Sequence, residues 1–234
     1  MGRVLNDPDA SGMTTLVGEM RDRSGDCTMK RLNVALTVML FAGTVTSAGG
    51  QNSASEIRKA AEEKAVNLCS TCHGPRGIST SPEFPILAAQ RNGYLEAQID
   101  AFRKQTRAEK DAHDFMWGIA GNLDEAIIGG IAAYYADQPP ARGHSDDPAL
   151  VAKGKELFDK GLPDRGVPAC MACHGADAAG TGDFPRLAGQ HAKYVIKQLN
   201  YIQSLVRTAP VMHGIVKDLT SDEIRAVAAY LQSK

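Results

Sequence analysis

The sequence has little net charge, few aromatic residues and no long hydrophobic run. Its 26 Lys and Arg residues nearly balance its 27 Asp and Glu residues, and aromatic residues make up only 6% of the chain. A nearly neutral chain without a basic run lacks the electrostatic patch that holds nucleic acid. The main apolar stretch, residues 32–43, is shorter than the roughly 20 residues that cross a bilayer. These absences argue against a nucleic-acid partner and against a membrane-spanning helix.

The segment 29–48 has the pattern of a secretory signal peptide. Lys30 and Arg31 precede the apolar stretch, and small residues around Ala48 suit a cleavage site. We therefore expect translation to start at Met29, with residues 1–28 an over-extended N-terminus, and the mature protein to be exported to the periplasm. A short uncleaved membrane anchor stays open as the alternative.

Cysteine is also scarce, and its odd count of five does not suit a disulfide framework. Cys27 lies in the part expected to be removed. The other four form two C-x-x-C-H motifs, the attachment signature of c-type haem, in which both thiols bond the porphyrin and the histidine binds the iron. The sequence therefore predicts two haem c groups, attached by Cys69, Cys72, Cys170 and Cys173, with His73 and His174 as iron ligands.

Two other uses of paired cysteines were weighed. Four thiolates could bind one zinc ion, and a C-x-x-C pair could act as a redox dithiol. The two motifs lie 101 residues apart, each is followed by histidine, and no βαβ pattern surrounds either of them. Haem attachment is therefore the favoured interpretation.

An internal repeat divides the chain. The 24-residue segments that begin at Phe84 and Phe184 share eight identical positions, and the two haem motifs are offset by a similar distance. We predict two homologous domains, 49–141 and 142–234, joined by a connection rich in turn-forming residues.

Each domain has helical patterns and no convincing run of alternating β-branched residues. Asp147 is a good N-cap before Pro148, and Thr220 with Glu223 forms a capping box. Apolar residues then recur at helical spacing towards the C-terminus. The predicted fold class is all-α.

Methionine supplies the expected sixth iron ligands. Apart from Met171, which lies inside a haem motif, each predicted domain has one methionine, just before its last helix. Iron held by histidine and methionine has no open position, which favours electron transfer over catalysis. We predict Met116 and Met212 as the ligands; His113, His191 and His213 are the competing candidates.

The chain resembles the dihaem cytochrome c4 family. The second domain carries this resemblance most strongly, in residues 166–175, residues 184–190 and Tyr194 with Gln198 and Leu199. It implies two tandem class I cytochrome c folds. It also implies a periplasmic carrier that makes transient contacts with a quinol-oxidising complex, a dehydrogenase or a cytochrome oxidase. Family positions near the haem propionates correspond to Gln90, Tyr94, Gln190 and Tyr194, and Arg107 and Arg207 are expected to pair with a propionate.

The first domain departs from the second at its opening helix. Ala61 and Ala65 stand where the second domain has Gly154 and Phe158. The opening helix is expected to pack on the last helix, so this contact should be looser in the first domain.

We predict an electron carrier rather than an enzyme. The main rival is a dihaem electron-transfer subunit of a larger dehydrogenase, of the flavocytochrome or alcohol dehydrogenase type. A haem peroxidase with one five-coordinate iron and a metal-binding structural module are further rivals. Peripheral association with the membrane also stays open.

Overall fold

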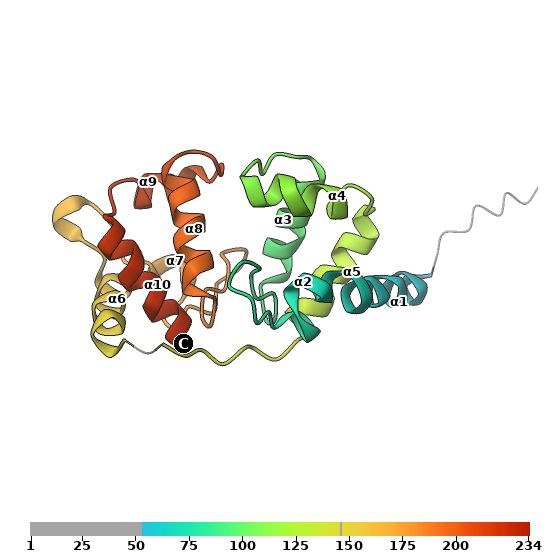
Figure 1. Cartoon of the computed structure of the whole chain (residues 1–234), viewed down its shortest axis with the longest axis horizontal. Helices are drawn as coiled ribbons and strands as arrows, with labels where there is room; N and C mark the ends of the chain where they lie inside the picture. Colours follow the sequence, from blue (N-terminus) through green and yellow to red (C-terminus); the bar gives the residue numbers. More distant parts are fainter. Residues whose placement is uncertain (1–52, 146) are drawn as a thin grey trace, which may run out of the picture. The chain divides into compact units, whose positions relative to one another are not determined.

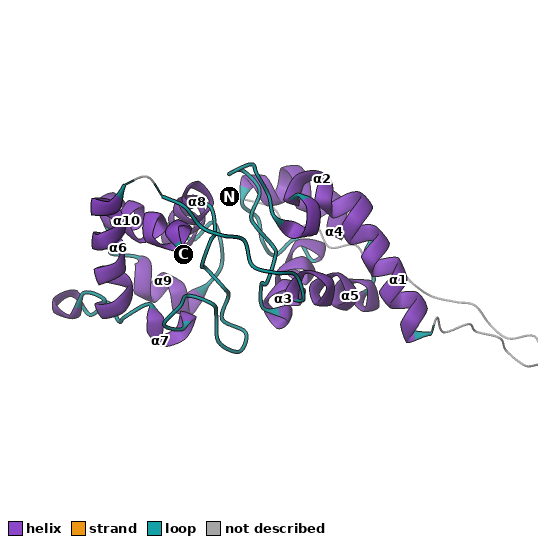
Figure 2. Ribbon diagram, turned by 90° about the horizontal axis from the view of Figure 1, so that it is seen from below, coloured by secondary structure: helices purple, strands orange, loops and turns teal. Residues whose placement is uncertain are grey.

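The computed structural model describes residues 53–145 and 147–234, which belong to one compact unit, Gly49–Lys234. Within these ranges the chain forms helices and loops without a strand (Figure 2), apart from one isolated bridge between Leu162 and Val167. This confirms the predicted all-α class. No helix in the described ranges is long and apolar enough to cross a bilayer. The predicted signal peptide and Cys27 lie outside the described residues.

The first half of this unit holds five α-helices and three tighter or wider helical turns (Figure 1). A capping box at Ser53 starts the first helix, and the side chain of Asp124 caps the last. The elements are α1 (Ala54–Lys64), η1 (Ala65–Cys69), α2 (Ser70–His73), η2 (Pro75–Gly77), α3 (Asn92–Arg103), η3 (Ala112–Met116), α4 (Trp117–Ala120) and α5 (Glu125–Ala136).

The second half repeats the order of the five α-helices, but its one helical turn precedes the haem motif. The Asp147 side chain accepts from the Leu150 amide, and the predicted capping box of Thr220 and Glu223 is present, so both sequence-predicted helix starts are confirmed. The elements are α6 (Pro148–Lys160), η4 (Pro163–Arg165), α7 (Met171–His174), α8 (Ala192–Gln203), α9 (Pro210–Val216) and α10 (Ser221–Ser233).

In each half the opening helix packs on the last helix, and glycine makes the close crossing possible. A Cβ on Gly154 of α6 would lie 1.9 Å from the Ala226 carbonyl oxygen of α10. In the first half the glycine is on the other partner: a Cβ on Gly130 of α5 would lie 2.4 Å from the Ala61 Cβ of α1. A side chain at either glycine would meet the opposite helix, at its backbone in the second half and at the Ala61 side chain in the first.

The opening and last helices nevertheless contact each other less extensively in the first half than in the second, which confirms the expectation of a looser contact there. Ala61 and Ala65 are fully buried in the first core, and the Tyr135 hydroxyl donates to the Ala65 carbonyl oxygen at 3.1 Å. Tyr135 of the last helix thus lies against Ala65, the counterpart of Phe158, and the Tyr135 and Phe158 side chains are both fully buried.

Replacing Gly154 by alanine tests the helix crossing. The added methyl group meets backbone rather than a flexible side chain, so the holoprotein should lose about 1–3 kcal/mol of unfolding free energy. Gly118→Ala is the control because a Cβ at Gly118 meets nothing within 4 Å. Chemical denaturation measures both variants, and equal stability would contradict the close approach.

Candidate haem-binding site

Both C-x-x-C-H motifs open onto one cavity of about 1090 Å³ inside the compact unit. Its walls are mainly apolar side chains from both halves, and the polar groups gather where the halves meet. The cysteines Cys69, Cys72, Cys170 and Cys173 and the histidines His73 and His174 all line it.

The two motif histidines are held in the same way. Each lies at the C-terminal end of a short helix and is hydrogen-bonded through Nδ1 to a proline carbonyl oxygen, His73 to Pro85 at 2.9 Å and His174 to Pro185 at 3.0 Å. Among the described residues the buried Nε2 of His174 has no hydrogen-bond partner. An orphaned imidazole nitrogen at the wall of an apolar cavity is what an iron ligand requires.

Burial keeps these imidazoles uncharged. It lowers the pKa of His73 and of His174, and the proline carbonyl oxygens raise it by less. A neutral imidazole has a free lone pair for a metal, so the environment favours the ligating form.

No disulfide bond joins any of the four motif cysteines. In the first half the opening helix widens into the π-helical turn η1, which ends at Cys69, and Cys72 follows in α2. Burial raises the pKa of the Cys170 thiol to about 11. In the described part of the chain, no three His, Cys, Asp or Glu side chains form a group that could hold a metal ion, so the zinc alternative gains no support.

The structure brings both predicted methionines to the cavity. Met116 ends the turn η3, Met212 lies in α9, and both side chains line the cavity. The competing histidines do not line it. His113 has a 66% exposed side chain, His191 contacts the Ser79 carbonyl oxygen at 3.0 Å, and His213 contacts that of Ile202 at 3.0 Å.

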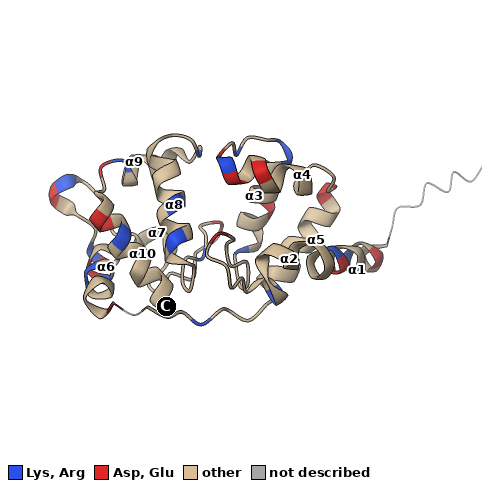
Figure 3. Ribbon diagram, viewed as in Figure 1, with Lys and Arg blue, Asp and Glu red and all other residues tan. Residues whose placement is uncertain are grey.

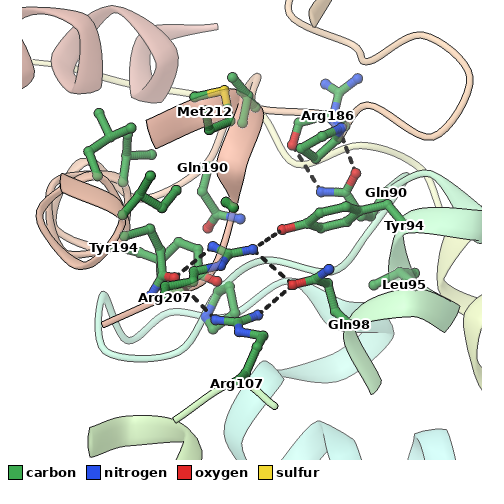
Figure 4. A pocket seen from close by; sticks show the side chains of 18 of the residues that line it. Gln90, Tyr94, Leu95, Gln98, Arg107, Arg186, Gln190, Tyr194, Arg207 and Met212 are labelled. Carbon is green, nitrogen blue, oxygen red and sulfur yellow. Dashed lines mark hydrogen bonds between the residues drawn. The ribbon is translucent and has the colours of Figure 1, made fainter. Parts of the chain in front are cut away.

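Two buried arginines meet where the halves join (Figure 4). The Gln98 Oε1 atom accepts from Arg107 at 2.9 Å and from Arg207 at 2.8 Å. The Gln198 Oε1 atom likewise accepts from Arg107 at 3.1 Å and from Arg207 at 2.7 Å. Arg107 also pairs with the carboxylate of Glu109. Each half thus contributes one arginine and one glutamine to a single network.

This network has a surplus of positive charge. Two buried guanidinium groups face one buried carboxylate, and buried charges are stable only when they are paired. Burial raises the pKa of Tyr94, but Arg207 and Arg107 lower it by more, so its net shift is downward. A porphyrin has an apolar ring and anionic carboxylates at one edge. The apolar walls and the excess of arginine therefore fit haem.

Gln90, Gln190, Tyr94 and Tyr194 all line the cavity. The two glutamine side chains also bond the backbone of the opposite half, Gln90 at Arg186 and Gln190 at Ile86.

Three residues of the network, Gln98, Gln198 and Glu109, were not predicted from the sequence as part of the site. Gln98 and Gln198 had a usable signal, because each follows a repeated tyrosine by four residues and so shares its helix face. Glu109 had none, because its counterpart in the second half is Ala209 and an isolated acidic residue is usually exposed.

Comparison with known proteins gives the same assignment. The cytochrome c family model matches residues 151–234. A cytochrome c-552 of Acidithiobacillus ferridurans is 35% identical over 94% of this chain and 100% of its own length. A cytochrome c4 of Thiocapsa roseopersicina is 40% identical over 74% of this chain and 91% of its own.

A solved cytochrome c4 structure from Acidithiobacillus ferrooxidans matches with a TM-score of 0.68. It is 40% identical and covers 71% of this chain and 98% of the solved one. A more distant relative, a thiosulfate dehydrogenase electron acceptor of Thiomonas intermedia, is 31% identical over 71% of this chain and 78% of its own. Similarity of this extent, on a fold with two haem motifs, shows that the chain belongs to the cytochrome c4 family of dihaem, c-type electron-transfer proteins.

Proposed function

We propose that the protein is a periplasmic carrier that moves electrons between respiratory donors and a terminal oxidase or another redox partner. The observation that carries this proposal is the shared cavity, which both haem motifs and both candidate methionines line. In the proposed assignment Cys69 and Cys72 attach the first haem, with His73 and Met116 as iron ligands. Cys170 and Cys173 attach the second, with His174 and Met212 as iron ligands.

When bound, each haem supplies an iron that alternates between the ferric and ferrous states and so carries one electron. The protein sets how readily this happens. A methionine thioether is a soft, weak donor that raises the reduction potential relative to a second histidine. With histidine on one side and methionine on the other, oxygen and peroxide find no open position, which supports a carrier rather than an enzyme.

Arg107 and Arg207 would pair with the haem propionates. Both are buried at the cavity wall, and Glu109 neutralises only one of them. Propionates near the junction of the halves would bring the two haem edges close to one another, as transfer between them requires.

The proposed domain boundary falls between residues 141 and 142. Beyond it the chain is tied to the second half, because the Gln232 side chain of α10 donates to the His144 carbonyl oxygen at 2.9 Å. Domains 49–141 and 142–234 would then each hold one haem.

The alternative is a dihaem electron-transfer subunit of a larger dehydrogenase. The relative from Thiomonas intermedia is named an electron acceptor of thiosulfate dehydrogenase. A similar pairing here would replace the diffusing carrier by one that works beside a single enzyme.

Isolating the exported protein distinguishes these functions and tests its location. We expect a monomer in the periplasmic fraction whose N-terminus follows Ala48, because residues 29–48 have the pattern of a cleaved signal peptide. Size-exclusion chromatography and N-terminal sequencing make the measurement. A stoichiometric dehydrogenase partner would instead support the subunit, and a mature N-terminus upstream of Met29 would refute the proposed start.

Replacing Cys170 and Cys173 together by alanine should leave one covalent haem in each chain instead of two. The second domain should also lose helix content, because its core residues line the cavity that the haem would fill. A pyridine haemochrome assay and circular dichroism give the two readouts, and the matching Cys69 and Cys72 double variant is the control. Two retained haems, or a fully folded second domain, would contradict the assignment.

Met212→Ala should open one iron without releasing its haem. The optical spectrum should show one high-spin haem that binds carbon monoxide, with a lower reduction potential because the thioether is gone. Met171→Leu is the matched control, because Met171 lies in the same half but does not line the cavity. Met116→Ala should act in the same way on the other haem. If Met212→Ala stays low-spin and unreactive, the sixth ligand is a different residue.

A further inference from the structure

Two glutamines clamp the halves together by reciprocal backbone hydrogen bonds. The Gln190 side chain of the second half accepts from the Ile86 amide at 2.9 Å and donates to the Ile86 carbonyl oxygen at 3.0 Å. The Gln90 side chain of the first half accepts from the Arg186 amide at 2.7 Å and donates to the Arg186 carbonyl oxygen at 2.9 Å (Figure 4). Each amide thus bonds one residue of the opposite half at both its backbone groups.

These bonds fall beside the motif histidines. The Ile86 amide belongs to the same peptide unit as the Pro85 carbonyl, which accepts from His73 Nδ1 at 2.9 Å. One planar peptide unit therefore connects the His73 ring to the Gln190 amide of the other half. The peptide between Pro185 and Arg186 connects His174 to Gln90 in the same way.

The orientation of each glutamine amide is fixed by its partners. The Gln190 Oε1 atom also accepts from the His191 amide at 3.1 Å, and the Gln90 Oε1 atom accepts from the Arg91 amide at 2.9 Å. Backbone amides are donors only, so the oxygen must face them. Both glutamines are only 7% exposed, and therefore water does not readily replace these bonds when one is removed.

We propose that each glutamine positions the iron-ligating histidine of the opposite domain: Gln190 acts on His73, and Gln90 acts on His174. This rests on the proposed function, in which both histidines bind iron. A peptide whose N–H group donates has a more strongly accepting carbonyl oxygen, because hydrogen bonds in a chain polarise one another. A stronger bond at Nδ1 fixes the ring and makes the imidazole a better donor to the metal.

Within residues 53–145 and 147–234, the peptide N–H groups of Ile86 and Arg186 donate to the opposite glutamines and not to a residue of their own half. Each histidine also contacts a phenylalanine ring of its own half edge to face, His73 with Phe84 and His174 with Phe184. Other bonds between the halves fall elsewhere; Lys197 of α8, for example, donates to Glu83 and Asp111 at 3.0 and 2.7 Å. The lysines of α8 appear as its blue segments in Figure 3. Ion pairs of this kind hold the domains together without touching the proline peptides.

The test exchanges each glutamine for methionine in the full-length, haem-loaded protein. Gln190→Met keeps the side-chain length but removes both bonds to Ile86. The haem of the first domain should then show a changed electron paramagnetic resonance spectrum and a higher reduction potential, because a less basic imidazole stabilises ferric iron less. The haem of the second domain should keep its spectrum and its reduction potential. Gln90→Met should give the reverse, and the Met116→Ala and Met212→Ala variants assign each signal to its haem.

His191→Leu is the control. It removes a bond between the halves from the neighbouring residue, at Ser79, but leaves the peptide between Pro85 and Ile86 untouched. We expect it to change neither haem. If His191→Leu shifted the reduction potential as much as the glutamine variants do, the interface as a whole would be responsible and the proposal would be overturned.

The crossed pattern separates positioning from loss of folding. A variant that only loosens its own domain would change the spectrum and potential of its own haem, or of both haems. Either result overturns the proposal. An unchanged spectrum and potential at both haems also overturns it. Because the two clamps are equivalent, either variant alone is sufficient if the other does not assemble. If the unmodified protein lacks low-spin spectra of histidine–methionine type, the proposed iron ligands are wrong. If those spectra are present but the crossed shifts are absent, only the glutamine clamp is wrong.

Discussion

The structure depends on filling the cavity that extends through both halves. A space of about 1090 Å³ with mainly apolar walls is large for a unit whose cores are built from three modest clusters of side chains. Helices α3 and α8 turn one face to the cavity, and apolar side chains on that face, such as Ile99, Phe102 and Leu199, are only partly buried by the protein itself. A large flat group against them would complete their burial. Covalent attachment through adjacent cysteines keeps that group in place, which gives small helical domains the staple they need.

The junction between the halves combines two kinds of interaction with separate consequences. The arginine–glutamine network collects positive charge where anionic haem edges would lie, and the glutamine clamps fix the peptides behind the iron-ligating histidines. Both sets are nearly symmetric because the halves are repeats of one unit. Glu109 breaks the symmetry: a buried carboxylate beside Arg107, with Ala209 as its counterpart, gives the two haems different electrostatic surroundings.

Comparison of the two halves shows which packing features are kept and which differ between them. The closeness of the first and last helices is retained in both halves, while the glycine that permits it changes sides, from Gly154 on α6 to Gly130 on α5. A buried aromatic side chain lies in both contacts, on the opening helix as Phe158 and on the last helix as Tyr135. Comparison of single positions predicted the looser first contact, but it did not show which helix supplies the glycine or the aromatic ring.

The sequence by itself determined the helical class, the capped starts of α6 and α10 and the repeat, because capping and periodicity are local. It also determined the haem motifs, since two thiols and a histidine must be adjacent to hold one porphyrin. Only the tertiary structure decided that Gln90 and Gln190 bond the opposite half, that Glu109 is buried beside Arg107, and that the methionines and not the competing histidines reach the cavity. Those outcomes depend on how two distant segments meet, and residue spacing along one chain carries no information about that contact.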